Sequence, residues 1–247
     1  MAESLKVKAI VEYDGTDYQG FQVQAAAPTV QGALEKGLRA VAGEPIRVIG
    51  SGRTDAGVHA QGQVVHFDIK WGHALPALQR AWNAHLPTDI AVRGLEIAPA
   101  GFHARFSAQS REYRYSIYAG QERSPLLERF AHHLPQALDV LAMAEAAREL
   151  CGRHDFSAFG RPPSGTNAVR TVYRAVWQRQ GEMLYFDITG DAFLRHMVRI
   201  IVGTLLLVGM GRLTAPDVRA ILQSRDLDHP QAAAPPCGLC LMQVNYR

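Results

Sequence analysis

One short segment of the chain combines residue types that acid–base or nucleophilic chemistry needs. It runs from Gly50 to His59 and reads GSGRTDAGVH. Its glycines allow positive φ angles and a close approach of a ligand to the backbone. Arg53 precedes Asp55 by two residues, and a nearby guanidinium favours the charged form of a carboxylate. Asp55 is therefore a candidate nucleophile or general base; the alternative is an aspartate that only caps a glycine-rich turn.

Two other chemistries compete with this interpretation. A phosphate-binding loop is disfavoured because the segment lacks the Lys-Ser/Thr ending of a P-loop and the three-glycine dinucleotide pattern. A hydrolase would need His59, His66 and Asp68 together. However, His66 and Asp68 alternate with Val65 and Phe67, which predicts that they lie on the exposed face of a strand.

A zinc site is the third alternative. Cys151 and His154 have C-x-x-H spacing, and Cys237 and Cys240 have C-x-x-C spacing, both of which are typical of zinc ligands. Cys240 falls in a predicted strand, where alternate residues point to opposite faces. We therefore expect no metal.

The first half of the chain predicts the elements that position the glycine-rich segment. Val7, Ala9 and Val11 alternate with charged residues as in a half-buried strand, and Thr29 can cap a helix that ends at Gly43. The expected strands are Lys6–Tyr13, Ile46–Ile49, Val65–Ile69 and Ile90–Ile97, and a second helix is expected at Leu75–Ala84.

The second half repeats this arrangement of strands and helices. Tyr113, Tyr115 and Ile117 share one face of a predicted strand, and a hairpin is expected across Gln180-Gly181. The expected strands are Arg111–Tyr118, Val172–Arg179, Met183–Thr189 and Gly238–Tyr246; the expected helices are Leu138–Leu150, one capped by Asp191 and running through Val208, and one that begins at Thr214-Ala215-Pro216-Asp217. We therefore predict two α+β domains, residues 1–105 and 106–247.

The composition is that of a globular protein. Of 247 residues, 47% are hydrophobic and 20% are charged, unlike a disordered chain. The longest apolar run, Ile200–Met210, is about half the length needed to cross a bilayer, and the N-terminal residues lack the apolar core of a signal peptide. The three cysteines do not form a disulfide framework, so we expect a cytoplasmic protein that does not enter a membrane.

Nearly all the basic residues are arginine, and the formal net charge is +3. A guanidinium can bind a phosphate through two hydrogen bonds and can stack on a nucleobase, which a lysine ammonium cannot do. Codon bias in a high-GC genome would produce the same excess. The positions of the arginines therefore matter more than their number.

Several motifs resemble those of one enzyme family. GRTDAGVH, followed by GQVVHF, is similar to the signature of the tRNA pseudouridine synthase A family. The similarity extends through VEYDGTDYQGFQ, FHARFSAQSREYRY, AFLRHMVRIIVG and GLCLMQVNY, in the order of the family. The resemblance implies an isomerase that converts uridine to pseudouridine at positions 38, 39 and 40 of the tRNA anticodon arm, without cofactor or metal. It also implies a homodimer.

The resemblance assigns roles to five residues. Asp55 matches the catalytic aspartate, and Arg53 matches an arginine that helps to take the target base out of its stack. Tyr113 matches an active-site tyrosine that packs on the uracil and takes the C5 proton. Arg199 matches an arginine that pairs with the catalytic aspartate. Arg195, predicted one turn earlier on the same helix face, either reaches RNA phosphate or is a solvated surface charge.

The implied fold is α+β, with two similar halves forming a mixed, largely antiparallel central sheet flanked by helices and a catalytic cleft between them. Two segments depart from the family. Phe21-Gln22-Val23-Gln24 keeps an aromatic residue but lacks a basic one, and Gly160–Val169 is unlike other members. We assign no role to the second segment.

Two arginine-rich segments are predicted to follow the RNA backbone. Residues 156–181 contain four arginines and no acidic residue. The second group has five arginines and three glutamates: Arg105, Arg111, Arg114, Arg123 and Arg129, with Glu112, Glu122 and Glu128. Phosphate contacts of this kind supply affinity and salt dependence more than sequence choice.

Overall fold

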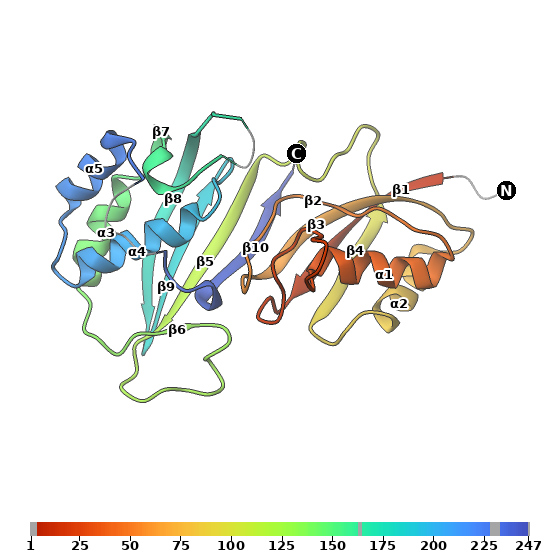
Figure 1. The fold of residues 1–247 in the computed structure, drawn as a ribbon, viewed down its shortest axis with the longest axis horizontal. Helices are drawn as coiled ribbons and strands as arrows, with labels where there is room; N and C mark the ends of the chain where they lie inside the picture. The colour runs from red at the N-terminus through yellow and green to blue at the C-terminus, as the bar shows by residue number, and fades with distance from the viewer. Residues whose placement is uncertain (1–3, 163–164, 228–232, 247) are drawn as a thin grey trace. The chain divides into compact units, whose positions relative to one another are not determined.

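The computed structural model describes residues 4–162, 165–227 and 233–246. Its backbone contacts divide the chain into two compact units (Figure 1). Unit 1 comprises Met1–Gln109 and Leu241–Arg247, and unit 2 comprises Ser110–Cys240. Each unit combines a sheet with helices, as expected for the α+β class.

The C-terminal residues belong with unit 1, although the predicted domain 106–247 contains them. Hydrogen bonds explain this placement. The backbone N–H of Gln109 donates to the Asn245 carbonyl at 2.9 Å, and the Tyr246 hydroxyl donates to the Ala104 carbonyl at 2.7 Å.

The unit 1 sheet has the strand order β4-β1-β3-β10, and β2 pairs with β3. The pairs β1–β3, β1–β4 and β2–β3 are all antiparallel. The Phe67 ring of β3 packs edge-on against Trp82 of α2, with 5.1 Å between ring centroids, so the helices cover the sheet face that carries Phe67. The elements are β1 (Ser4–Tyr13), α1 (Val30–Ala42), β2 (Ile49–Gly50), β3 (His59–Lys70), α2 (Leu75–Ala84), β4 (Ile90–Ile97) and β10 (Leu239–Asn245).

Local sequence accounts for both ends of α1. The Thr29 hydroxyl accepts a hydrogen bond from the backbone N–H of Gly32, which is the expected N-cap. At the other end Gly43 adopts a φ of 77° and donates its N–H to the Arg39 carbonyl. The predicted helix is therefore confirmed at both boundaries. The predicted strand at Ile46–Ile49 is wrong in extent, because only Ile49–Gly50 pairs with β3.

The unit 2 sheet has the strand order β5-β9-β8-β7, and β6 pairs with β5. The β5–β6 pair is parallel, whereas the other described pairs are antiparallel, which confirms mixed, largely antiparallel pairing. Helix α3 packs against β8, α4 and α5, and Figure 1 shows these helices grouped beside the strands of this unit. The elements are β5 (Ser110–Tyr118), β6 (His132–His133), α3 (Val140–Arg148), β7 (Gly152–Asp155), β8 (Val169–Gln180), β9 (Met183–Gly190), α4 (Met197–Gly209) and α5 (Ala215–Ser224), with short 3-10 turns at Ser157–Phe159 and Pro236–Gly238.

The start of α5 matches its prediction, but the start of α4 does not. Thr214 and Asp217 form a reciprocal capping box. Asp191 does not cap α4. Its carboxylate accepts hydrogen bonds from the backbone N–H groups of Thr171 and Ala192, so it fixes the end of the β8–β9 pair. Helix α4 begins six residues later, after His196, which has a left-handed φ of 64°.

Candidate active site

The predicted site residues fall on both units, and each group is described within its own unit. In unit 1, residues 51–58 connect β2 to β3; because they carry the candidate Asp55, we call them the catalytic loop. The Ser51 N–H donates to the Val64 carbonyl at 2.8 Å, and its hydroxyl lies 2.6 Å from Gln63 Oε1. The buried Gln63 amide also donates to the Gly52 carbonyl at 3.1 Å. The first residues of the loop are thus held to β3.

The segment that follows β1 holds the middle of the catalytic loop. The Tyr13 hydroxyl lies 2.8 Å from Thr54 Oγ1, and both side chains are buried. Thr54 also accepts a backbone hydrogen bond from Phe21 at 3.1 Å, and Gly57 donates to the Tyr18 carbonyl at 3.2 Å. Thr54 directly before Asp55 and Gly57 two residues after it are therefore anchored by residues 13–23, which we call the supporting segment.

Glycine is required at two points of this supporting segment. Gly20 has a φ of +91°, and a Cβ there would lie 2.7 Å from the Thr54 carbonyl oxygen. A Cβ on Gly15 would lie 2.0 Å from the Val58 carbonyl oxygen. The backbone of the catalytic loop therefore approaches its support more closely than any side chain permits.

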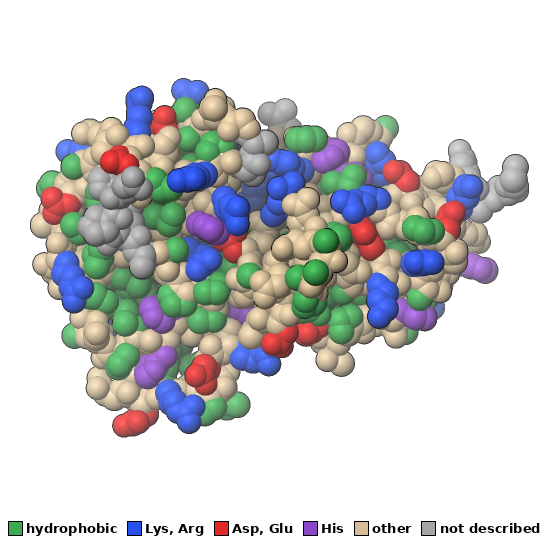
Figure 2. All heavy atoms as spheres, viewed as in Figure 1, with side chains coloured by type: hydrophobic (Ala, Val, Ile, Leu, Met, Phe, Trp, Pro, Cys, Tyr) green, Lys and Arg blue, Asp and Glu red, His purple; other side chains and the backbone are tan. Residues whose placement is uncertain are grey.

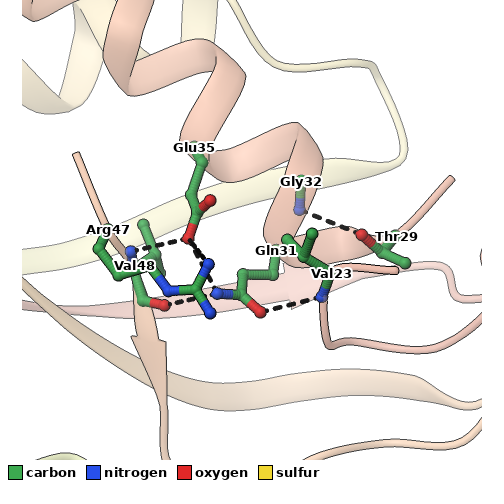
Figure 3. Close-up of polar contacts among 7 residues, drawn as sticks. All are labelled: Val23, Thr29, Gln31, Gly32, Glu35, Arg47 and Val48. Atoms are coloured by element: carbon green, nitrogen blue, oxygen red, sulfur yellow. Dashed lines mark hydrogen bonds and ion pairs between the residues drawn. The ribbon is translucent and has the colours of Figure 1, made fainter. Parts of the chain in front are cut away.

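A buried glutamine ties the supporting segment to α1 and to the chain that leads into β2 (Figure 3). Gln31 accepts from the Val23 N–H at 3.0 Å and donates to the Val48 carbonyl at 2.9 Å and to Glu35 at 2.8 Å. Glu35 also accepts from the Val48 N–H at 3.0 Å and pairs with Arg47 at 3.6 Å. The side chain of Gln31 is 4% exposed, so the loss of either amide contact would leave a buried polar group without its partner.

The two candidate side chains of the catalytic loop differ in exposure. Arg53 is exposed and Asp55 is half-buried. The Val58 N–H donates to the Asp55 carbonyl at 3.2 Å, which closes a turn directly after the aspartate. A carboxylate on a rigid turn beside an exposed guanidinium can meet a substrate without rearrangement of the backbone.

The histidines of the hydrolase alternative do not form a common site. His59 Nδ1 accepts from the Gly15 N–H at 3.0 Å and lies 3.2 Å from Asp14. His66 Nδ1 accepts from the Ala104 N–H at 3.1 Å. The prediction that His66 lies on an exposed face is wrong, because residues after β4 cover it and leave it 3% exposed.

In unit 2, Tyr113 and Tyr115 share the buried face of β5, as predicted. Tyr113 is 9% exposed and meets Phe193 edge-on, with 5.2 Å between ring centroids. Tyr115 is fully buried and donates its hydroxyl to the Pro235 carbonyl at 2.9 Å. Burial holds the pKa of Tyr115 far above its ordinary value, with Cys237 adding to the rise. Tyr115 is therefore a residue of the core.

The two arginines at the start of α4 have different surroundings. Arg199 is half-buried in the first turn of the helix, and its Nε donates to the Ala234 carbonyl at 2.7 Å. Arg195 is exposed and precedes the helix, so its predicted position on the same helix face as Arg199 is wrong. The Arg195 N–H donates to the Arg161 carbonyl at 3.0 Å in an isolated bridge. Residues 163 and 164 of the unassigned segment 160–169 lie outside the described residues.

Some arginines of the two segments predicted to follow the RNA backbone form ion pairs within the protein. Arg114 donates two hydrogen bonds to Asp187, at 2.7 and 2.9 Å, and this bidentate contact raises the Arg114 pKa. Asp187 is buried, so Arg114 neutralises a charge inside the unit. Arg123 pairs with Glu128 at 3.8 Å. Figure 2 shows Lys and Arg side chains on both units, with Asp and Glu side chains among them.

Some positioning residues carry no signal in the sequence on their own. Tyr13, Gly20, Gln31 and Gln63 belong to ordinary strand, turn and helix patterns, and only their partners across the unit reveal their role. A buried glutamine at the start of an amphipathic helix is the one local hint, because that position faces the core.

The described residues show neither a cluster of metal ligands nor a helix that could span a membrane. Within the described ranges, no group of three or more His, Cys, Asp or Glu residues is arranged to hold a metal ion. His154 instead contacts the Cys151 carbonyl through Nε2 at 2.8 Å. None of the helices in the described part of the chain is long and apolar enough to cross a membrane.

Comparison with known proteins gives long matches. A family model described as tRNA pseudouridine synthase matches residues 9–107 and 146–247. A protein of Syntrophotalea carbinolica named tRNA pseudouridine synthase A is 46% identical over 97% of this chain and 96% of its own length. Proteins of the same name from Geobacillus kaustophilus and Bacillus subtilis are 44% and 42% identical, each over 98% of this chain and over 94% and 99% of their own lengths.

One solved structure, described as a Cbf5-Nop10-Gar1 complex, is a distant match. It is 11% identical over 85% of this chain and 55% of that chain, with a TM-score of 0.33.

Proposed function

Because this chain belongs to the tRNA pseudouridine synthase family, we propose that it isomerises uridine at positions 38, 39 and 40 of the tRNA anticodon stem and loop. The chain is an isomerase of the pseudouridine synthase type. One observation carries the assignment of its site. The half-buried Asp55 and the exposed Arg53 lie together on a loop that β3 and the residues after β1 hold in place.

The reaction breaks the bond between ribose C1′ and uracil N1, and it forms a bond between C1′ and C5. N1 gains a proton and C5 loses one, so the product has the same composition as the substrate. Since nothing is oxidised, reduced or hydrolysed, the proposed reaction uses no cofactor and no metal.

Asp55 is proposed as the catalytic carboxylate. It assists the departure of N1 by attacking the sugar, by attacking the base, or by promoting loss of the 2′ proton; each route starts from the ionised carboxylate. The fixed backbone on both sides of Asp55 keeps the carboxylate in one orientation during the rotation of the base.

Arg53 is proposed to keep the target base out of its stack. Extraction of a base from a helix costs a few kcal/mol, which a group that fills the vacated space can offset. The Arg53 side chain is exposed on the same loop as Asp55, and a planar guanidinium can both stack and donate hydrogen bonds.

Three residues of unit 2 are proposed to complete the site. Tyr113 packs on the extracted uracil and takes the C5 proton. Arg199 pairs with the Asp55 carboxylate, and its contact with the Ala234 carbonyl limits the orientations of its guanidinium. Arg195 contacts an RNA phosphate, for which its exposure suits it.

The proposed substrate is therefore tRNA, held by a homodimer in the cytoplasm. The test uses purified protein and unmodified tRNA transcripts with uridine at positions 38, 39 and 40, with and without chelator. Pseudouridine at these positions, formed equally with chelator, is expected. Absence of conversion, conversion only elsewhere, or loss of activity with chelator would contradict the proposal.

A further inference from the structure

Three aromatic rings of unit 1 contact one another in a row on the sheet face opposite the helices. The last ring of the row is exposed to solvent. Phe67 faces the helices, and its strand neighbour His66 points to the opposite side. The His66 ring contacts the His103 ring, with 4.8 Å between centroids, and His103 stacks on Phe106 at 4.3 Å with an interplanar angle of 29°. We call His66, His103 and Phe106 the aromatic stack.

The turn at 102–107 fixes the stack. His103 Nδ1 accepts hydrogen bonds from the backbone N–H groups of Arg105 at 3.2 Å and Phe106 at 3.3 Å. The His103 N–H donates to the Ser107 hydroxyl at 3.0 Å, and the Ser107 N–H donates back to the His103 carbonyl at 2.9 Å. The rings are therefore set in place before any ligand arrives.

Phe106, the outer ring of the stack, is exposed to solvent. Phe106 is 75% exposed, although its neighbours Phe102 and Ala104 are 7% and 0% exposed. A rigid, exposed phenylalanine stacked on a histidine offers a flat apolar surface that water solvates poorly. The chain holds this surface ready for another flat group.

Charged side chains of both signs surround the stack, and the guanidinium of Arg105 lies beside its outer ring. The Arg105 guanidinium lies 5.6 Å from the Phe106 ring centroid, and Lys8 lies 5.4 Å from the Phe102 centroid. Lys8 also pairs with Glu96 at 2.6 Å. Lys6 and Asp68 are partners across the β1–β3 pair, so the carboxylates near the stack each have a lysine neighbour. An aromatic surface flanked by cations is the chemistry that recognises an unpaired nucleobase and its phosphate.

The aromatic stack lies well along β3 from the residue that follows the catalytic loop. His59 follows the catalytic loop directly, and His66 lies seven residues further along the same strand. At about 3.3 Å per residue this separation is roughly 23 Å. On this spacing we take a base on Phe106 to be a different one from the base that reacts.

We propose that Phe106, supported by His103 and His66, is a stacking platform for an unpaired nucleobase of the tRNA substrate, several nucleotides from the reacting uridine. This inference rests on the proposed function, because it takes the substrate of that function as the ligand. Phe106 acts as a binding and positioning residue and takes no part in the chemical step.

The test compares Phe106→Leu, which keeps the apolar bulk but lacks a π face, with Phe106→Tyr, which retains it. The dissociation constant for an unmodified tRNA transcript is measured at several salt concentrations, together with kcat and KM. For Phe106→Leu we expect a rise of about 5- to 100-fold in Kd and KM, an unchanged kcat and an unchanged slope of affinity against salt. Phe106→Tyr should restore wild-type affinity. Leu141→Ala, which alters an 84% exposed aliphatic residue of unit 2, is the control and should bind like wild type.

Several results would overturn the platform. One is that Phe106→Leu binds tRNA with wild-type affinity, or that Phe106→Tyr fails to restore affinity. Another is a changed slope of affinity against salt concentration. A change of oligomeric state in sedimentation would instead place a second copy of the chain on this surface. The proposed function is tested separately by the wild-type protein. A wild-type protein that binds tRNA without converting uridine, together with loss of binding in Phe106→Leu, would retain the platform and reject the proposed function.

Discussion

The hydroxyl of Tyr13 and the hydroxyl of Thr54 lie 2.8 Å apart in the interior of unit 1, and this contact anchors the residue directly before Asp55. The carbonyl of the same threonine accepts a hydrogen bond from the Phe21 N–H. The loop residue directly before the candidate catalytic group is thus fixed through both its side chain and its backbone. Preorganisation of this kind is what a reaction that must rotate a base within the site requires.

Replacement of Gly20 tests the support beneath the catalytic loop. In Gly20→Ala the new Cβ would lie 2.7 Å from the Thr54 carbonyl oxygen, so that carbonyl must shift and carry Asp55 with it. The left-handed backbone adds a strain of about 1–2 kcal/mol. We expect kcat/KM for tRNA to fall at least tenfold at a temperature where the variant remains folded.

Gly43→Ala is the matched control. Gly43 also has a positive φ, of +77°, but nothing lies within 4 Å of a Cβ placed there. It should lose stability through the same strain and keep wild-type kcat/KM. Equal activity of the two variants would show that the contact with Thr54 does not position the catalytic loop.

The Arg114–Asp187 pair indicates a structural role for one arginine of the segments predicted to follow the RNA backbone. Asp187→Asn removes the charge partner of Arg114 next to the core, and we expect the free energy of unfolding to fall by about 2 kcal/mol. This is less than for a fully buried pair, because the Arg114 side chain is 35% exposed. Urea denaturation measures the change. Glu149→Gln, at the exposed pair with Arg219, should have a much smaller effect, and equal effects would contradict the structural role.

Stability should decrease as the pH falls below about 6.5, because buried histidines must remain neutral. Burial lowers the pKa of His66, with His103 and Lys6 adding to the effect, and burial also lowers the pKa of His132. On acidification the unfolded chain therefore binds protons at a higher pH than the folded chain does. Stability that is present above pH 6.5 is lost as the pH falls.

His66→Asn removes one of these titrating groups and keeps an acceptor close to Nδ1. The fall in unfolding free energy between pH 7 and pH 5 should become shallower, by at most about 1.4 kcal/mol per pH unit. Denaturant titrations at several pH values give the slope. A slope as steep as that of the wild type would show that His66 does not contribute.

Tyr113→Phe separates chemistry from packing. The ring still meets Phe193, so we expect a melting temperature near that of the wild type. Loss of the hydroxyl should stall turnover while tRNA remains bound, as single-turnover assays and binding measurements can show. An unfolded variant would identify Tyr113 as a core residue only, and full turnover would exclude it from the proton transfer.

Much of the fold was predictable because its elements have strong local signals. Thr29 and Gly43 mark the two ends of α1, and the alternation of Tyr113, Tyr115 and Ile117 marks the buried face of β5. These signals need only neighbouring residues, since capping and periodicity act within one element.

The errors arose where distant residues decide the outcome. His66 alternates like a solvent-facing residue, but the Ala104 N–H reaches its ring from a turn after β4. Asp191 has the residue type and sequence position of a helix cap, yet its carboxylate accepts a hydrogen bond from the backbone N–H of Thr171 instead. A tertiary hydrogen bond can therefore override a local preference.

The candidate site was predictable only in part. Arg53 and Asp55 stood out because they lie together on a glycine-rich segment, GRTDAGVH, that resembles a family signature. The residues that hold this segment, such as Tyr13 and Gln63, are common types in common patterns, and only the folded chain connects them to it.

The most direct test of the account is the conversion of unmodified tRNA transcripts by Asp55→Asn beside the wild type. The variant keeps the size of the side chain and removes its charge. We predict that it folds, binds the transcript with near wild-type affinity and forms no pseudouridine at positions 38, 39 or 40. Formation of pseudouridine there at the wild-type rate would contradict the catalytic role of Asp55.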